Sequence, residues 1–122
     1  MKKVLIIDDE EDFCYFLKKN LEGRGEYKVT FCTSGRQAFN VILKELPDIV
    51  LIDILLPDLS GSEIAEKMRG DARTSKIPFI FLTAVIVEDD IKVRGDVIGG
   101  NFFIAKPVKI ERIVEVITEA LA

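Results

Sequence analysis

The chain opens with an apolar run that ends in a pair of acids, Val4-Leu5-Ile6-Ile7-Asp8-Asp9. Such a continuous aliphatic run is typical of a strand that is buried on both faces, as strands of parallel sheets are. Similar runs occupy residues 49–52 and 79–82, and two further β-rich stretches occupy residues 27–32 and 102–105. We therefore expect five short strands, three of which read as buried parallel strands.

Segments of helical periodicity alternate with these runs. Apolar residues recur at helical spacing in residues 10–23, 35–45, 61–69 and 108–121. A fifth helix over 88–97 has the weakest pattern, because Gly95 interrupts it. The repeated strand-then-helix order predicts one α/β domain of (βα)5 type, a doubly wound parallel five-stranded sheet with helices on both faces.

Two helix starts carry a local signal. Ser34 is followed three residues later by Gln37, and Ser60 by Glu63. Both pairs have the spacing of a capping box, in which the serine hydroxyl accepts a hydrogen bond from a backbone amide of the first turn. We expect helices to begin directly after both serines.

The composition limits the chemistry. The chain of 122 residues has 17 Lys and Arg against 21 Asp and Glu, a net charge of −4 that argues against direct binding of nucleic acid. No apolar run approaches the roughly 20 residues of a membrane span. Cys14 and Cys32 lie in apolar patterns, so we expect core thiols and a reducing, cytoplasmic setting.

Histidine is absent from the chain. This excludes a Ser-His-Asp triad, a zinc ion bound by histidine, and a phosphohistidine donor within the chain. The chemistry must therefore use carboxylates, lysine, hydroxyl groups, backbone groups, or a cation held by oxygen atoms.

The carboxyl ends of four predicted strands carry groups that suit one reaction. In a doubly wound sheet the working site lies beyond these ends. The groups, in chain order, are Asp8 with Asp9, Asp53, Thr83, and Lys106 with Pro107.

Each residue also has an ordinary explanation. Asp8 or Asp9 alone would suit a helix cap, and Asp53 a turn ahead of Pro57. Thr83 alone would be a common strand residue, and Lys106 a surface lysine. Their joint occurrence at one edge favours function.

Clustered carboxylates repel one another, so they must bind a proton or a cation. With oxygen ligands, Mg²⁺ is the natural choice. A carboxylate is also a nucleophile toward phosphorus, and a lysine and a hydroxyl group then stabilise the transferred group. Asp53 is the expected nucleophile, because its strand lies in the middle of the sheet.

These residues resemble the receiver domain of two-component response regulators, and the resemblance covers essentially the whole chain. It rests on four segments: Val4-Leu5-Ile6-Ile7-Asp8-Asp9-Glu10, Asp53-Ile54-Leu55-Leu56-Pro57 with Gly61, Ile77-Pro78 followed by Phe81-Leu82-Thr83-Ala84, and Phe103-Ile104-Ala105-Lys106-Pro107. The resemblance implies a flavodoxin-like fold with strand order 2-1-3-4-5. It also implies that residues 1–122 are a single receiver domain, with no effector domain within this chain, whether it is a stand-alone receiver or part of a longer regulator.

The resemblance implies a role for each site residue. Asp53 accepts a phosphoryl group from a sensor histidine kinase or a histidine phosphotransfer protein. Asp9, Asp53 and the Leu55 backbone carbonyl bind Mg²⁺, and Asp8 acts mainly through water. Thr83 and Lys106 contact the phosphoryl group, and the Lys106–Pro107 bond is cis.

Phosphorylation is then expected to alter the surface of the fourth helix, fifth strand and fifth helix, which a downstream target protein or effector domain reads. The domain is a phosphoacceptor rather than an enzyme, with self-catalysed phosphorylation and slow autodephosphorylation. Phe103 stands where the family often has a tyrosine switch. We hypothesise that Phe103 stays inward or is weakly coupled to phosphorylation.

Other classes fit less well. A flavin-binding domain would not carry an acidic run after its first strand, and no Gly-rich nucleotide loop is present. An aspartate-nucleophile phosphatase would commonly have a second acid where Leu55 stands. The alternative that stays open is a receiver-like interaction module whose output does not depend on phosphorylation.

Overall fold

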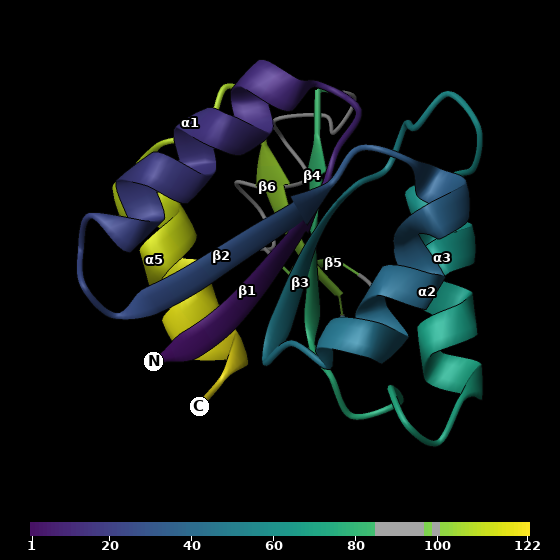
Figure 1. Ribbon diagram of the computed structural model, residues 1–122. Helices are drawn as coiled ribbons and strands as arrows, with labels where there is room; N and C mark the ends of the chain where they lie inside the picture. The colour runs from purple at the N-terminus through teal and green to yellow at the C-terminus, as the bar shows by residue number, and fades with distance from the viewer. Residues whose placement is uncertain (85–96, 99–100) are drawn as a thin grey trace.

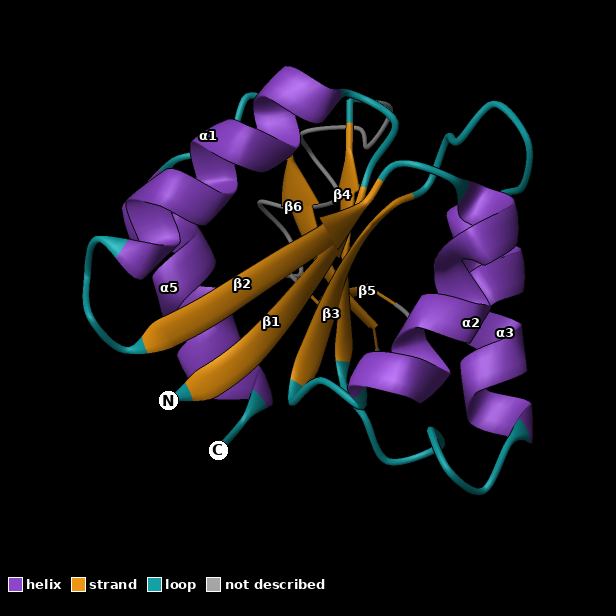
Figure 2. Cartoon of the chain, viewed as in Figure 1, coloured by secondary structure: helices purple, strands orange, loops and turns teal. Residues whose placement is uncertain are grey.

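The computed structural model describes residues 1–84, 97–98 and 101–122. One sheet lies between two pairs of helices (Figures 1 and 2). On one face lie α1 (Glu11–Glu22) and α5 (Ile110–Ala120), and on the other lie α2 (Gly35–Glu45) and α3 (Gly61–Gly70). Among the described residues, none of the helices has the length and apolar character needed to cross a membrane.

The sheet has the order β2-β1-β3-β4-β6-β5. Its strands are β1 (Lys2–Ile7), β2 (Tyr27–Cys32), β3 (Ile49–Asp53), β4 (Phe79–Thr83), β5 (Val97–Ile98) and β6 (Asn101–Ala105). All neighbouring pairs are parallel except β5 with β6. The predicted five parallel strands in order 2-1-3-4-5 are confirmed, with β6 as the fifth.

Two details differ from the sequence prediction. The antiparallel strand β5 was not expected, because a pair of residues is too short to show a periodic pattern. The predicted helix over 88–97 lies outside the described residues up to position 96, and Val97 belongs to β5 instead. The fourth helix, one part of the expected output surface, therefore lies outside the described residues up to position 96, whereas β6 and α5 are described.

Alternation along the buried strands gives the sheet two apolar faces. In β1, Val4 and Ile6 pack with residues of α1 and α5, whereas Leu5 and Ile7 pack with residues of α2 and α3. Because side chains alternate between the faces of a strand, each buried strand contributes to both cores. The continuous aliphatic runs are thus explained by burial on both sides.

Both predicted serine caps are present. The Ser34 hydroxyl accepts a hydrogen bond from the Gln37 amide at 3.3 Å, and the Ser60 hydroxyl accepts one from the Glu63 amide at 3.2 Å. Asp58, in the loop between β3 and α3, adds a second acceptor at the start of α2. Its carboxylate accepts hydrogen bonds from the Gly35 amide at 3.1 Å and the Arg36 amide at 3.0 Å.

Gly61 lies against the end of β3. A Cβ atom at this position would meet the Asp53 carbonyl oxygen and would lie 2.9 Å from the Ile54 Cα and 3.0 Å from the Ile52 Cγ2. The Gly61 amide also donates to the Ile54 carbonyl at 2.8 Å. Helix α3 can therefore approach the strand that carries Asp53 only with glycine here.

We predict that Gly61→Ala lowers the free energy of unfolding by about 1–3 kcal/mol, because the added methyl group must displace backbone atoms. The matched control is Gly70→Ala in the same helix, where an added Cβ would have nothing within 4 Å. That variant should stay within about 0.5 kcal/mol of the unmodified protein. Urea unfolding of the three proteins gives the comparison, and equal stability of the two variants would contradict the close approach.

A second prediction concerns Asp58 and acid. The Arg36 amide above all, with the Gly35 amide and the Ser34 hydroxyl, lowers the pKa of Asp58. A carboxyl whose pKa is lower in the folded state adds stability above its unfolded pKa of about 4 and loses that contribution as the pH falls through the folded value. The stability gap between the unmodified protein and Asp58→Asn, measured in urea, should therefore narrow from pH 6 to pH 3. A stability difference that does not change with pH would show that the Asp58 carboxylate does not contribute in this way.

Candidate functional site

Strand alternation directs three charged residues to one side of the sheet. The side chain of Asp8 lies on the same face of the sheet as those of Val4 and Ile6, because alternate residues of a strand share a face. For the same reason, Asp53 lies on the face of Ile49 and Leu51. Lys106 follows Ile104 in the same way. All three therefore extend from the carboxyl ends of their strands on the side covered by α1 and α5.

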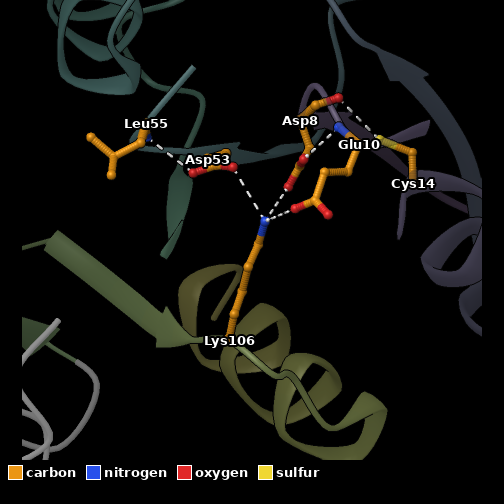
Figure 3. A network of polar contacts seen from close by, with 6 residues as sticks. All are labelled: Asp8, Glu10, Cys14, Asp53, Leu55 and Lys106. Carbon is orange, nitrogen blue, oxygen red and sulfur yellow. Dashed lines mark hydrogen bonds and ion pairs between the residues drawn. The ribbon is translucent and has the colours of Figure 1, made fainter. Parts of the chain in front are cut away.

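Lys106 lies at the centre of this group (Figure 3). Its Nζ is 2.7 Å from the Asp8 Oδ2, 3.2 Å from the Asp53 Oδ2 and 3.3 Å from the Glu10 Oε1. The lysine side chain is 15% exposed and that of Asp8 is fully buried, whereas that of Glu10 is 65% exposed. One ammonium group thus meets two interior carboxylates and one at the surface.

The turns after β1 and β3 hold the two interior carboxylates in the same manner. The Asp8 Oδ1 accepts a hydrogen bond from the Glu10 amide at 2.9 Å, and the Asp53 Oδ1 accepts one from the Leu55 amide at 3.0 Å. In each case the other oxygen, Oδ2, contacts Lys106. Each carboxylate is therefore oriented by the backbone two residues later, a common arrangement for aspartate in turns.

Burial and charge oppose each other at the Asp8–Lys106 pair. Burial raises the pKa of Asp8, and the hydrogen bond and charge of Lys106 counteract that rise in part. Burial would lower the pKa of Lys106, but the Asp8 hydrogen bond and the charges of Asp8 and Asp53 outweigh it and raise the pKa above its usual range. Lys106 is therefore fully charged near neutral pH and supplies the positive charge of the site.

Asp9 completes an acidic cluster. One carboxylate oxygen from each of Asp8, Asp9 and Asp53 lies within 4.8 Å of the others, with Asp9 exposed and the other two buried. Hard cations prefer such oxygen ligands. The cluster fits a divalent cation of this kind, and the exposed Asp9 leaves it open to solvent.

The helix-cap explanation for the acids does not hold. The residue before α1 is Glu10, and it makes no side-chain cap hydrogen bond. Asp8 bonds to the Glu10 amide, which lies before the helix. The acids after β1 are therefore placed by the turn toward Lys106 rather than by the helix.

Thr83 lies at the carboxyl edge, and Phe103 lies two residues before that edge on the neighbouring strand β6. Thr83 is buried at the end of β4, and its carbonyl accepts a hydrogen bond from the Lys106 amide at 3.0 Å. The Lys106–Pro107 peptide bond is cis. Phe103 packs against Phe81, with ring centroids 5.1 Å apart, on the side of α2 and α3. Phe103 is thus partly buried and packs against the core between the sheet, α2 and α3.

Two residues at the site had no role in the sequence interpretation. Glu10 contacts Lys106, and the ring of Phe13 lies 4.4 Å from the Lys106 Nζ. Glu10 was visible as part of an acidic run, whereas Phe13 read as a core residue of the first helix. No local pattern connects either one with a lysine more than 90 positions later in the chain.

Cys14 is buried next to the site. Its buried thiol donates to the Asp8 carbonyl at 3.4 Å (Figure 3). Burial first, and then the charge of Asp8, raises the pKa of Cys14 to about 12. Cys14 is thus a core thiol as predicted, whereas Cys32 is only partly buried, and both are free.

The comparisons with known proteins agree with one another. The family model of the response regulator receiver domain matches residues 4–118. Protein PilH of Pseudomonas aeruginosa is 35% identical over 122 residues, which cover 100% of this chain and 99% of PilH. The phosphate regulon transcriptional regulatory protein PhoB of the same species is 38% identical over 106 residues, covering 87% of this chain and 45% of PhoB.

The solved structure of the chemotaxis response regulator CheY4 of Vibrio cholerae aligns with a TM-score of 0.83 and 25% identity over 99% of each chain. The chain spans about half the length of some curated relatives, among them PhoB and the response regulator Rre1 of Synechocystis. It spans nearly the whole of PilH. The family model spans most of the chain and PilH aligns with all of it, so the chain belongs to the family of response regulator receiver domains.

Proposed function

We propose that residues 1–122 act as one phosphoacceptor domain and that Asp53 is the residue phosphorylated. The supporting observation is the contact of the Asp53 Oδ2 with the Lys106 Nζ at 3.2 Å, within an acidic cluster at the carboxyl edge of the sheet. A nucleophilic carboxylate needs a nearby positive charge to approach a phosphoryl group, which is itself anionic. Asp53 has that charge beside it.

In the proposed reaction, a carboxylate oxygen of Asp53 attacks the phosphorus atom of a phosphohistidine. The P–N bond breaks as the new P–O bond forms, and the imidazole leaves with the electron pair and takes up a proton. The donor histidine must lie outside residues 1–122, because this stretch has no histidine. A sensor histidine kinase or a histidine phosphotransfer protein fits this requirement.

The acidic cluster is the proposed Mg²⁺ site. Asp9, Asp53 and the Leu55 carbonyl would hold the ion, and Asp8 would act mainly through water. When bound, Mg²⁺ neutralises charge on the phosphoryl oxygens. The Lys106 ammonium would bind one phosphoryl oxygen and the Thr83 hydroxyl would donate to another.

The domain would catalyse its own phosphorylation and, slowly, its own dephosphorylation, while being consumed as a substrate in each cycle. The product would alter the surface formed by the helix expected from the sequence over 88–97, by β6 and by α5, which a target protein or effector domain in the cytoplasm would read. The packing of the partly buried Phe103 ring on Phe81 supports weak coupling of this residue to that change. The same packing supports the second candidate, an interaction module that works without phosphorylation.

We predict that incubation with acetyl phosphate and Mg²⁺ adds one phosphoryl group to the protein and that Asp53→Asn abolishes the addition. The matched control is Asp48→Asn at the opposite end of the strand, where the carboxylate accepts a hydrogen bond from the Lys3 amide at 2.7 Å. Intact mass spectrometry with and without a chelator provides the measurement. No addition to the unmodified protein, under conditions where Mg²⁺ binds, would favour the interaction module.

We further predict that Asp9→Asn weakens Mg²⁺ binding by at least about tenfold, because it removes one charged ligand. Asp12→Asn is the control, since it removes the same charge from an exposed position in the same acidic run. Isothermal titration of Mg²⁺ into the two variants compares them. Equal affinities would show that Asp9 does not hold the ion.

A further inference from the structure

The Lys106 ammonium is attracted in two directions. Asp8 and Asp53 hold it inward, at 2.7 and 3.2 Å, whereas the Glu10 carboxylate attracts it outward from an exposed position at 3.3 Å. A lysine side chain has four carbon atoms and many rotamers, so charge alone does not fix where its end lies. A further contact on the inward side would add to the attraction of Asp8 and Asp53 and restrict this freedom.

The ring of Phe13 provides such a contact. Its centroid lies 4.4 Å from the Lys106 Nζ, within the range of a cation–π interaction. The ring is partly buried and packs against the core cluster between the sheet, α1 and α5. It is therefore held in place by residues other than the lysine.

The ring also limits access of water to the ammonium. Phe13 and Lys106 both line a surface hollow of about 490 Å³, which Phe16 and Val108 border as well. The Lys106 side chain is only 15% exposed although it lines this hollow. Loss of the ring would enlarge the hollow next to the ammonium and allow it to move toward Glu10 and solvent.

We propose that Phe13 is a positioning residue for phosphoryl transfer, whose ring face keeps the Lys106 ammonium at Asp8 and Asp53, where the phosphoryl group arrives. This inference rests on the proposed function of Asp53. The electron-rich ring face is the essential property, because an aliphatic side chain of similar size fills the space without attracting a cation.

The test compares the unmodified protein with Phe13→Leu, Phe13→Tyr and Phe16→Leu. Leucine keeps an apolar side chain, and tyrosine keeps the ring face. Phe16→Leu removes a ring from the same helix and the same hollow, and this ring has no cation–π contact with Lys106. A small-molecule donor is used so that contacts between a protein donor and the substituted surface do not affect the result.

The first readout is the rate of phosphorylation by acetyl phosphate at saturating Mg²⁺. We expect Phe13→Leu to lower the maximal rate by about fivefold, in line with the strength of a partly exposed cation–π contact. The acetyl phosphate concentration at half-maximal rate and the Mg²⁺ affinity should stay within about twofold of the unmodified protein. Phe13→Tyr and Phe16→Leu should keep the original maximal rate.

The second readout is the NMR signal of the Lys106 side-chain protons near Nζ. A ring face shifts such protons upfield, so the shift should be present in the unmodified protein and in Phe13→Tyr and absent in Phe13→Leu. This readout does not depend on phosphorylation. It therefore tests the contact itself in solution.

Distinct outcomes separate the two proposals. If the unmodified protein shows the upfield shift but takes up no phosphoryl group, the proposed function fails and the positioning role fails with it. If phosphorylation occurs and Phe13→Leu matches the original rate, the positioning role alone is overturned. A parallel loss of rate and Mg²⁺ affinity in Phe13→Leu, or a loss of rate in Phe13→Tyr, would also overturn it, because either would indicate general disruption of the fold.

Discussion

The Lys106 ammonium group compensates the negative charge at the carboxyl edge of the sheet. The side chain of Asp8 is fully buried, and that of Asp53 is nearly so. Burying a charged carboxylate that has no partner strongly destabilises the folded state. The lysine offsets this penalty for both at once, through contacts of 2.7 and 3.2 Å. A site with three neighbouring carboxylates and one lysine retains excess negative charge, so it is suited to bind a hard metal ion. It is also suited to bind an anionic group that replaces a carboxylate as the partner of Lys106.

The position of Lys106 depends on the order of the strands. Lys106 follows β6, which pairs with β4, and its amide donates to the Thr83 carbonyl. Asp53 follows β3, which lies between β4 and β1, the strand that precedes Asp8. A further strand inserted between β1 and β6 would add a strand width of about 5 Å to the distance that the lysine must span to reach both acids.

The two faces of the sheet divide the site. Asp8, Asp53 and Lys106 extend toward α1 and Phe13, whereas Phe103 packs against Phe81 on the side of α2 and α3. Lys106 and Phe103 are only three residues apart, on and just after the same strand. The charged edge and the Phe103 ring are therefore connected by the backbone of β6, although they lie on different faces of the sheet.

The sequence by itself determined the five parallel strands, four of the helices, the two serine caps and the set of residues at the carboxyl edge. These features follow from local rules, because aliphatic runs, helical spacing and the capping signal each lie within a few consecutive residues. The strand ends then meet at one edge as a consequence of parallel order. The short strand β5 was not predicted, because two residues are too few to show a periodic pattern.

Only the tertiary structure decided how the site residues contact one another. It showed which oxygen of each aspartate meets Lys106, that Glu10 shares the lysine, and that Phe13 lies over it. It also showed that Gly61 is required where α3 meets β3. These contacts join residues up to 98 positions apart. They depend on strand order, turn geometry and helix packing together. Because the contacting residues are far apart in the chain, no local sequence pattern predicts these contacts.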